Sequence, residues 1–215
     1  MRKVESAHTP DMRQERALIR QGHALVAGID EAGRGAWAGP VVAAAVILPG
    51  RAMRLAALRG VRDSKLLSPA QREALFPPIR EKALAVGIGM ASHKEIDAMG
   101  IVPATRLAMR RAVEMLARAP DALLIDALKL PDVLLPQRAL FHADARCLSV
   151  AAASIVAKVT RDRLMVELDA QYPGYELARH KGYGTQAHQQ ALARLGPCPI
   201  HRLTFKPVRS LAQLA

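Results

Sequence analysis

Residues 24–42 read ALVAGIDEAGRGAWAGPVV and combine an apolar run, two acids and a glycine-rich loop. The run over 24–29 is typical of a buried strand, and it ends abruptly at Asp30 and Glu31. Such an ending indicates a functional site, because a carboxylate removed from water needs a partner or a metal ion. The glycines that follow mark a tight loop before a second apolar strand over 41–48.

Outward from this segment the chain alternates between strand and helix patterns. Further strands are predicted over 84–91, 122–125 and 139–143. Helices are predicted over 11–20, 103–118, 148–168 and 185–195, whereas residues 1–10 are polar and expected to be frayed. A long connection over 49–78 carries Asp63-Ser64-Lys65. Three early strands followed by alternating helices and strands predict an α/β fold with a mixed sheet.

The composition indicates a globular chain that favours polyanions. Of 215 residues 51% are apolar, which is enough to bury a core without staples. The formal charge of +12 favours a nucleic acid partner, although any well-solvated basic protein would have the same balance. Neither a signal sequence nor a membrane-length apolar segment is visible, and the two cysteines lack metal-binding spacing. We therefore expect a cytoplasmic protein with reduced thiols and no membrane association.

Acidic residues end or adjoin three of the predicted strands, namely Asp30, Glu31, Asp126 and Asp144. Strand ends of an α/β sheet meet in one crevice, so these carboxylates are expected to lie together. Clustered carboxylates repel one another, and divalent cations relieve that repulsion. Oxygen ligands without Cys or clustered His favour Mg²⁺ or Mn²⁺ and predict two-metal hydrolysis of a phosphodiester. One such Asp alone is more often a cap of a helix or turn.

Six segments, in order, resemble ribonuclease HII over residues 13–209. They are residues 28–42, Asp63-Ser64-Lys65, Ile125-Asp126, residues 144–162, HKGYGT over 180–185 and HRLTF over 201–205. One short motif would be weak support, but six in the same order and spacing leave little room for accident. The resemblance implies a ribonuclease H-like mixed sheet flanked by helices. It also implies a catalytic domain over 1–170 and a C-terminal helical, substrate-binding extension over 171–215.

The resemblance implies an activity as well. Members of that family cut the RNA strand of RNA/DNA hybrids. They also cut 5′ of single ribonucleotides in duplex DNA, leaving 3′-hydroxyl and 5′-phosphate ends. Asp30, Glu31, Asp126 and Asp144 match the four catalytic, metal-binding carboxylates, which implies two Mn²⁺ or Mg²⁺ ions. One ion would generate the attacking hydroxide and the other would stabilise the departing 3′ oxygen. The implied role is removal of ribonucleotides from DNA during replication and repair.

The same resemblance implies that the substrate is bound by Gly33, Arg34, Gly35, Lys65 and Tyr183. Glycines let the backbone approach a sugar, where amide groups can bind a 2′-hydroxyl. Arg34 would clamp a phosphate, and Lys65 would approach the scissile phosphate. Tyr183 would bond the 2′-hydroxyl and stack on the following deoxy sugar. Taken singly, the loop is an ordinary tight turn and Tyr183 an ordinary half-buried tyrosine.

Two positions depart from the family pattern, because Ala127 and Ala143 stand where glycine is usual. Each adds a methyl group next to a predicted ligand, so strand-end geometry or metal preference is open to change. We expect activity to survive, since the four ligands themselves are present. On the helix predicted over 148–168, Lys158, Arg161 and Arg163 are expected to divide between contacts to the DNA backbone and solvent.

Alternative functions stay open on the sequence alone. The same carboxylates would serve a hybrid-only nuclease like ribonuclease HIII or a junction resolvase, but Gly33-Arg34-Gly35 with Tyr183 argues against these. A non-catalytic RNA- or DNA-binding protein would explain the charge but not why buried strands end in acids. Residues 210–215 lack an aromatic pair of the sliding-clamp-binding type, so a clamp partner is unsupported. A chain of this size needs no partner to fold, and a monomer is expected.

Overall fold

The computed structural model describes residues 9–50 and 56–212. At its centre lies a five-stranded sheet in the order β3-β2-β1-β4-β5. The strands are β1 (Val26–Ala32), β2 (Val41–Ile47), β3 (Ala85–Ala91), β4 (Ala122–Asp126) and β5 (Gln137–Leu140). The pairs β1–β2 and β2–β3 are antiparallel, whereas β1–β4 and β4–β5 are parallel. The predicted mixed α/β sheet is confirmed.

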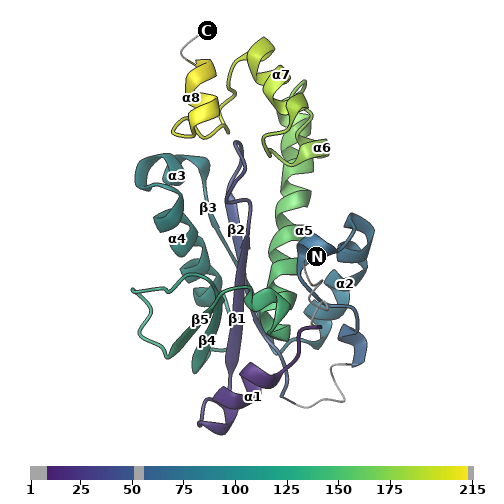
Figure 1. Ribbon diagram of the computed structural model, residues 1–215, viewed down its shortest axis with the longest axis vertical. Coiled ribbons are helices and arrows are strands. Elements are labelled where there is room, and N and C mark those ends of the chain that lie inside the picture. The colour runs from purple at the N-terminus through teal and green to yellow at the C-terminus, as the bar shows by residue number, and fades with distance from the viewer. Residues whose placement is uncertain (1–8, 51–55, 213–215) are drawn as a thin grey trace, which may run out of the picture.

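Helices cover both faces of the sheet, as Figure 1 shows. On one face lie α3 (His93–Met99) and α4 (Ile101–Glu114), and on the other lie α2 (Pro69–Lys82) and α5 (Leu148–Gln171). The C-terminal part is helical as predicted, and its helices gather near one end of α5. They are α6 (Leu177–His180), α7 (Gln186–Leu195) and α8 (Lys206–Ala212), while α1 (Arg13–Arg20) lies near the other end of the sheet. The boundary at residues 170/171 stays a prediction.

The central strand β2 separates two apolar cores. Its residues are fully buried, and alternate side chains face opposite sides because successive strand residues point in opposite directions. Ala44 and Val46 pack with the α2 and α5 side of the sheet, while Ala43 and Ala45 pack with the α4 side. These small side chains let helices approach both faces closely, which fixes the sheet as a rigid support for the loops at its end.

Two helices that the sequence analysis did not predict, α2 and α3, are present in the structure. Helix α2 begins with a capping box, in which Ser68 accepts from the Gln71 amide and the Gln71 side chain accepts from Ser68. The prolines inside this helix, Pro77 and Pro78, argue against a helix locally. Packing of Phe76 and Ile79 against the core outweighs that local preference. Helix α3 has a capping box of the same kind at Ser92.

Several predicted boundaries also shift. Helix α4 begins at Ile101, two residues before Pro103, and ends at Glu114 rather than Arg118. Proline is tolerated there, because the first turn of a helix has no internal acceptor for its amides. Strand β5 ends at Leu140, and residues 143–145 form a short 3₁₀ helix, η3, in place of the strand predicted to reach Ala143.

Of the remaining expectations, the fraying of residues 1–10 falls mostly outside the described residues; within them Pro10 is buried. Cys147 and Cys198 are both free thiols. Across residues 9–50 and 56–212, no helix combines the length and apolar character needed to cross a bilayer.

Candidate active site

The sheet brings the first three predicted acids together. Asp30 and Glu31 lie near the end of β1, and β4 runs parallel beside it with Ile29 in register with Ile125. The next residue on each strand is an aspartate, so Asp30 and Asp126 are neighbours across the sheet. Asp30 is buried, with only 5% of its surface exposed. Strand register alone therefore produces the acidic cluster that the sequence predicts.

Asp144 reaches the same place through a short connection after β5. The Ala143 amide donates to Asp126 Oδ1 at 2.8 Å, which holds η3 (Ala143–Ala145) against the end of β4. Asp144 lies within η3 and is buried. Burial, followed by the carboxylates of Asp63 and Asp126, raises the pKa of Asp144 to about 6. The sequence analysis did not single out Asp63 as a neighbour of this cluster.

Burial and neighbouring charges shift the pKa values of Asp30 and Glu31. Burial, and then the carboxylates of Glu31 and Asp126, raise the pKa of Asp30 well above its usual range. Burial also raises the pKa of Glu31, although Arg34 opposes the shift. Arg34 Nη1 lies 3.3 Å from Glu31 Oε1. Such a cluster is unfavourable by itself and favours cations, which lower the cost of ionising it.

Lys65 faces this cluster from the loop before α2. It belongs to the 3₁₀ helix η2 (Ser64–Leu66), where the Asp63 side chain accepts from its amide at 2.9 Å. Burial alone would lower the pKa of Lys65, but nearby carboxylates outweigh that effect and raise it. These carboxylates are Asp63, Asp30, Asp144 and Asp126. Lys65 is thus the cation that the acids share within the protein.

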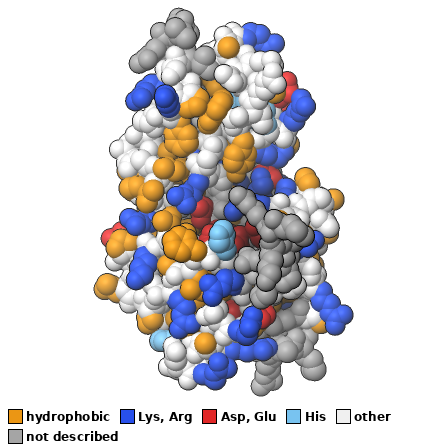
Figure 2. Space-filling model, in the orientation of Figure 1, with side chains coloured by type: hydrophobic (Ala, Val, Ile, Leu, Met, Phe, Trp, Pro, Cys, Tyr) orange, Lys and Arg blue, Asp and Glu red, His pale blue; other side chains and the backbone are white. Residues whose placement is uncertain are grey.

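A cavity of about 320 Å³ joins the acids to the glycine-rich loop. In Figure 2, acidic side chains show at the middle of the face, with Lys and Arg around them. Eight of the nine predicted site residues line the cavity, together with Ala32, Ser64 and Lys158; the eight are Asp30, Glu31, Gly33, Arg34, Gly35, Lys65, Asp126 and Tyr183. Asp144 does not line it, although its charge contributes to the raised pKa of Asp30.

The donor set suits hard cations, since the cavity offers carboxylate oxygens and no thiolate or imidazole. In the side-chain arrangement of the described residues, no group of three His, Cys, Asp or Glu residues is placed to bind a metal ion. Three of the four carboxylates line the cavity, namely Asp30, Glu31 and Asp126. The chemistry of the residues therefore fits Mg²⁺ or Mn²⁺, with side-chain rotation needed to close the coordination.

Tyr183 lines this cavity beside the glycine-rich loop. Its backbone bridges to Ala36 in the glycine-rich loop, and its ring lies 5.3 Å from both Lys158 Nζ and Arg161 Cζ. Cations over an aromatic face are attracted by its negative face, so both side chains help to fix the ring. The Gly-Arg-Gly loop and Tyr183, which are about 150 residues apart in sequence, thus form one unit.

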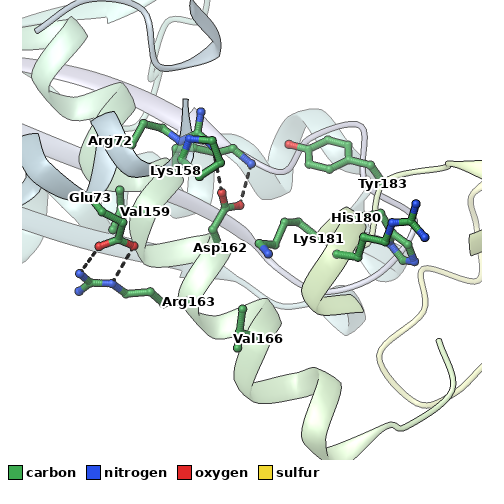
Figure 3. Close-up of a pocket in the computed structure, with 12 residues that line it drawn as sticks. Arg72, Glu73, Lys158, Val159, Asp162, Arg163, Val166, His180, Lys181 and Tyr183 are labelled. Carbon is green, nitrogen blue, oxygen red and sulfur yellow. Dashed lines mark hydrogen bonds and ion pairs between the residues drawn. The ribbon is translucent and has the colours of Figure 1, made fainter. Parts of the chain in front are cut away.

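Beside Tyr183 a second cavity of about 390 Å³ opens between α2, α5 and α6 (Figure 3). Its cations are partly neutralised, because Asp162 pairs with Lys158 at 2.6 Å and with Arg72 at 3.6 Å. Arg163 pairs with Glu73 and is half-exposed. Lys158 lines both cavities and links them.

The expectation for Arg161 was wrong. It neither reaches DNA nor faces water, because its side chain is fully buried and donates to three carbonyl groups. In the sequence Arg161 stands close to other cationic residues of the predicted helix, and no local pattern distinguishes a buried arginine from an exposed one. Arg202, in the last predicted motif, is buried in the same way and was not singled out by the sequence analysis.

Ala127 has a backbone conformation that explains the usual glycine. Its φ is +57°, in the left-handed region, whereas Ala143 is not among the described residues with positive φ. We expect Ala127→Gly to raise the free energy of unfolding by about 1 kcal/mol, because a side chain there costs that much. Ala143→Gly, the matched control, should lower it, since glycine gains only unfolded-state freedom at an ordinary φ. Urea unfolding at constant m-value tests the pair, and equal signs would contradict the strain.

Comparison with known proteins agrees with this geometry. The family model described as Ribonuclease HII matches residues 27–208. Ribonuclease HII of Dehalococcoides mccartyi is 54% identical over 207 residues, covering 94% of this chain and 95% of that protein. Ribonuclease H2 from Pyrococcus horikoshii OT3 has a TM-score of 0.72 at 28% identity, covering 88% of this chain and 98% of that one. Bst-RNase HIII in complex with Mn²⁺, at TM-score 0.67 and 23% identity over 99% of this chain and 76% of that chain, shares the fold.

Matches of this extent, together with the mixed sheet and its flanking helices, leave one assignment. The chain belongs to the ribonuclease HII family, and it is an enzyme, a nuclease that hydrolyses the RNA strand of RNA/DNA hybrids.

Proposed function

We propose that this enzyme also cuts 5′ of single ribonucleotides embedded in duplex DNA, leaving 3′-hydroxyl and 5′-phosphate ends, and so serves ribonucleotide removal. One observation carries the proposal: three of the four acids, the Gly-Arg-Gly loop and Tyr183 line the same cavity. A cleavage site and a surface suited to a 2′-hydroxyl therefore lie within one ribonucleotide of each other.

Asp30, Glu31, Asp126 and Asp144 are proposed to hold two divalent ions. When bound, Mg²⁺ or Mn²⁺ supplies Lewis acidity and activates water for attack on the phosphodiester. Bst-RNase HIII was crystallised with Mn²⁺, but at 23% identity it supports the fold alone. The metal proposal rests on this chain's own carboxylates: burial, followed by neighbouring carboxylates, raises the pKa of Asp30 and of Asp144, and a bound cation would offset that cost.

The chain's other residues position the substrate. Lys65 is proposed to neutralise the scissile phosphate, because its side chain already lies close to the carboxylates of the acidic cluster. Arg34 is proposed to exchange its 3.3 Å contact with Glu31 for a phosphate. The backbone of Gly33 and Gly35 is proposed to bind the 2′-hydroxyl, with Tyr183 beside them in the same cavity. Nucleic acid is thus the proposed partner, and the enzyme is proposed to act as a monomer.

The test is incubation with duplex DNA containing one ribonucleotide, with Mg²⁺, Mn²⁺ or EDTA, beside an all-DNA duplex and a continuous RNA/DNA hybrid. We expect one nick immediately 5′ of the ribonucleotide, abolished by EDTA and absent from the all-DNA duplex. Cleavage of the hybrid without the single-ribonucleotide nick would discard the roles of Arg34 and Tyr183 and keep the carboxylates. Cleavage that survives EDTA would overturn the metal proposal.

A further inference from the structure

The Gly-Arg-Gly loop is held from behind by a fully buried arginine of the C-terminal segment. Arg202 Nη2 donates to the Gly33 carbonyl at 2.8 Å, and Nη1 donates to the Arg34 carbonyl at 2.9 Å. Its Nε donates to the Gly39 carbonyl at 3.0 Å. A single planar fork therefore binds three carbonyl groups of one loop, a geometry that only guanidinium provides.

This fork determines where the loop's amides point. In a trans peptide the carbonyl of one residue and the amide of the next point in opposite directions. Because the carbonyls of Gly33 and Arg34 turn toward Arg202, the amides of Arg34 and Gly35 turn away from it. These residues line the cavity, whereas Arg202 lies buried behind them. Within the described part of the chain, neither amide has a hydrogen-bond acceptor.

Burying such a charge is costly unless it is well compensated. Among the described residues Arg202 makes no salt bridge, and its donors meet backbone carbonyls only. An apolar side chain would leave the carbonyls of Gly33, Arg34 and Gly39 without these donors, so arginine at this position holds the conformation of the loop. Arg161 binds the neighbouring backbone in the same way and donates to the carbonyls of Ala38, Pro40 and Lys181.

We propose that Arg202 is a positioning residue that aims the amides of Arg34 and Gly35 into the cavity, so that they donate to the 2′-oxygen of a bound ribonucleotide. The inference rests on the proposed function. It adds that recognition of the ribose depends on a C-terminal arginine that does not itself touch the substrate. The C-terminal extension then contributes to specificity from behind the loop, besides any direct contact with nucleic acid.

The test compares binding of two duplexes that differ only by one 2′-hydroxyl. Affinities are measured with Ca²⁺, whose irregular coordination supports binding more readily than ordered catalysis. The wild type should bind the single-ribonucleotide duplex more tightly than the all-DNA duplex. Arg202→Lys should lower this ratio of affinities about tenfold, the loss expected for one to two hydrogen bonds. Its affinity for the all-DNA duplex should stay within about twofold of the wild-type value.

A ratio of affinities is insensitive to the fraction of folded protein, which separates positioning from a loss of stability. Leu192→Ala is the matched control: Leu192 is buried in the C-terminal core on α7, and its side chain makes no hydrogen bond to Gly33, Arg34 or Gly35. It should lower the melting temperature and leave the ratio unchanged. A folded Arg202→Lys variant with the wild-type ratio would overturn the inference alone. A wild type that does not discriminate would overturn the proposed reading of the ribose itself.

A second measurement needs no variant. The amides of Arg34 and Gly35 should exchange more slowly with solvent deuterium when the single-ribonucleotide duplex is bound than when the all-DNA duplex is bound. Equal protection by both duplexes in residue-resolved exchange would overturn the inference, because the amides would then not meet the 2′-oxygen.

Discussion

Asp30→Asn is expected to reduce cleavage of a single-ribonucleotide duplex by about a thousandfold, roughly 4 kcal/mol of lost transition-state stabilisation. The amide removes one anionic ligand from the centre of the cluster and cannot hold a cation as a carboxylate does. The fold should persist, because the side-chain Oδ1 atom that accepts from the Glu31 amide at 2.7 Å is retained in asparagine.

The same substitution should stabilise the metal-free protein at neutral pH. Burial and the Glu31 carboxylate raise the pKa of Asp30 in the folded state, so the folded state binds more protons than the unfolded one. Stability of the metal-free wild type therefore falls as pH rises above the unfolded value near 4, with Asp144 contributing up to about 6. Asp30→Asn should reduce this loss of stability at higher pH. Added Mn²⁺ or Mg²⁺ should restore the lost stability in the wild type only.

Thermal melts from pH 4 to 8, with and without metal, measure this effect beside single-turnover cleavage. Glu15→Gln is the matched control, since Glu15 is a buried carboxylate on α1 whose pKa is also raised by burial. It accepts from Ser149 and does not line the cavity, so its loss should leave cleavage within about twofold. Wild-type turnover by Asp30→Asn would remove Asp30 from the catalytic set.

The sheet and its acidic cluster were predictable because their signals are local. An apolar run that ends in Asp30-Glu31 specifies both a strand and its chemistry, and parallel pairing with β4 then brings Asp126 alongside. Helix α2 was missed because Pro77 and Pro78 mask it, although Ser68 and Gln71 mark its start. The site assignment itself stays a prediction, since strand register places carboxylates but does not show what they bind.

Arg161 and Arg202 could not be predicted, for a different reason. Five of their six partners are backbone carbonyls more than 100 residues away, and a carbonyl has no sequence signature. The +57° φ of Ala127 was signalled only by departure from a family pattern, not by the residue itself. Local chemistry therefore predicted which groups take part, while long-range packing decided how they are aimed.

The two glycines of the Gly-Arg-Gly loop differ physically. The difference predicts that alanine at the two positions has opposite effects on stability, although it lowers activity at both. Gly33 has a φ of +93°, and a Cβ there would lie 2.0 Å from Arg161 Nε, so the fold itself requires glycine. Gly35 is not among the glycines with positive φ, and a Cβ there would have no heavy atom within 4 Å. Nothing in the described protein requires glycine at position 35, yet this residue lines the cavity beside the acids.

Gly35→Ala should therefore stabilise the protein by about 0.5 kcal/mol through reduced freedom of the unfolded chain. Cleavage at a single ribonucleotide should fall by about a hundredfold, because a methyl group displaces the sugar by the order of 1 Å from the attacking geometry. Gly33→Ala, the control, should lower both stability and activity. Urea unfolding and single-turnover rates test the pair. If Gly35→Ala cut at the wild-type rate, the ribose would not approach this loop, and the space beside Gly35 would have no part in substrate selection.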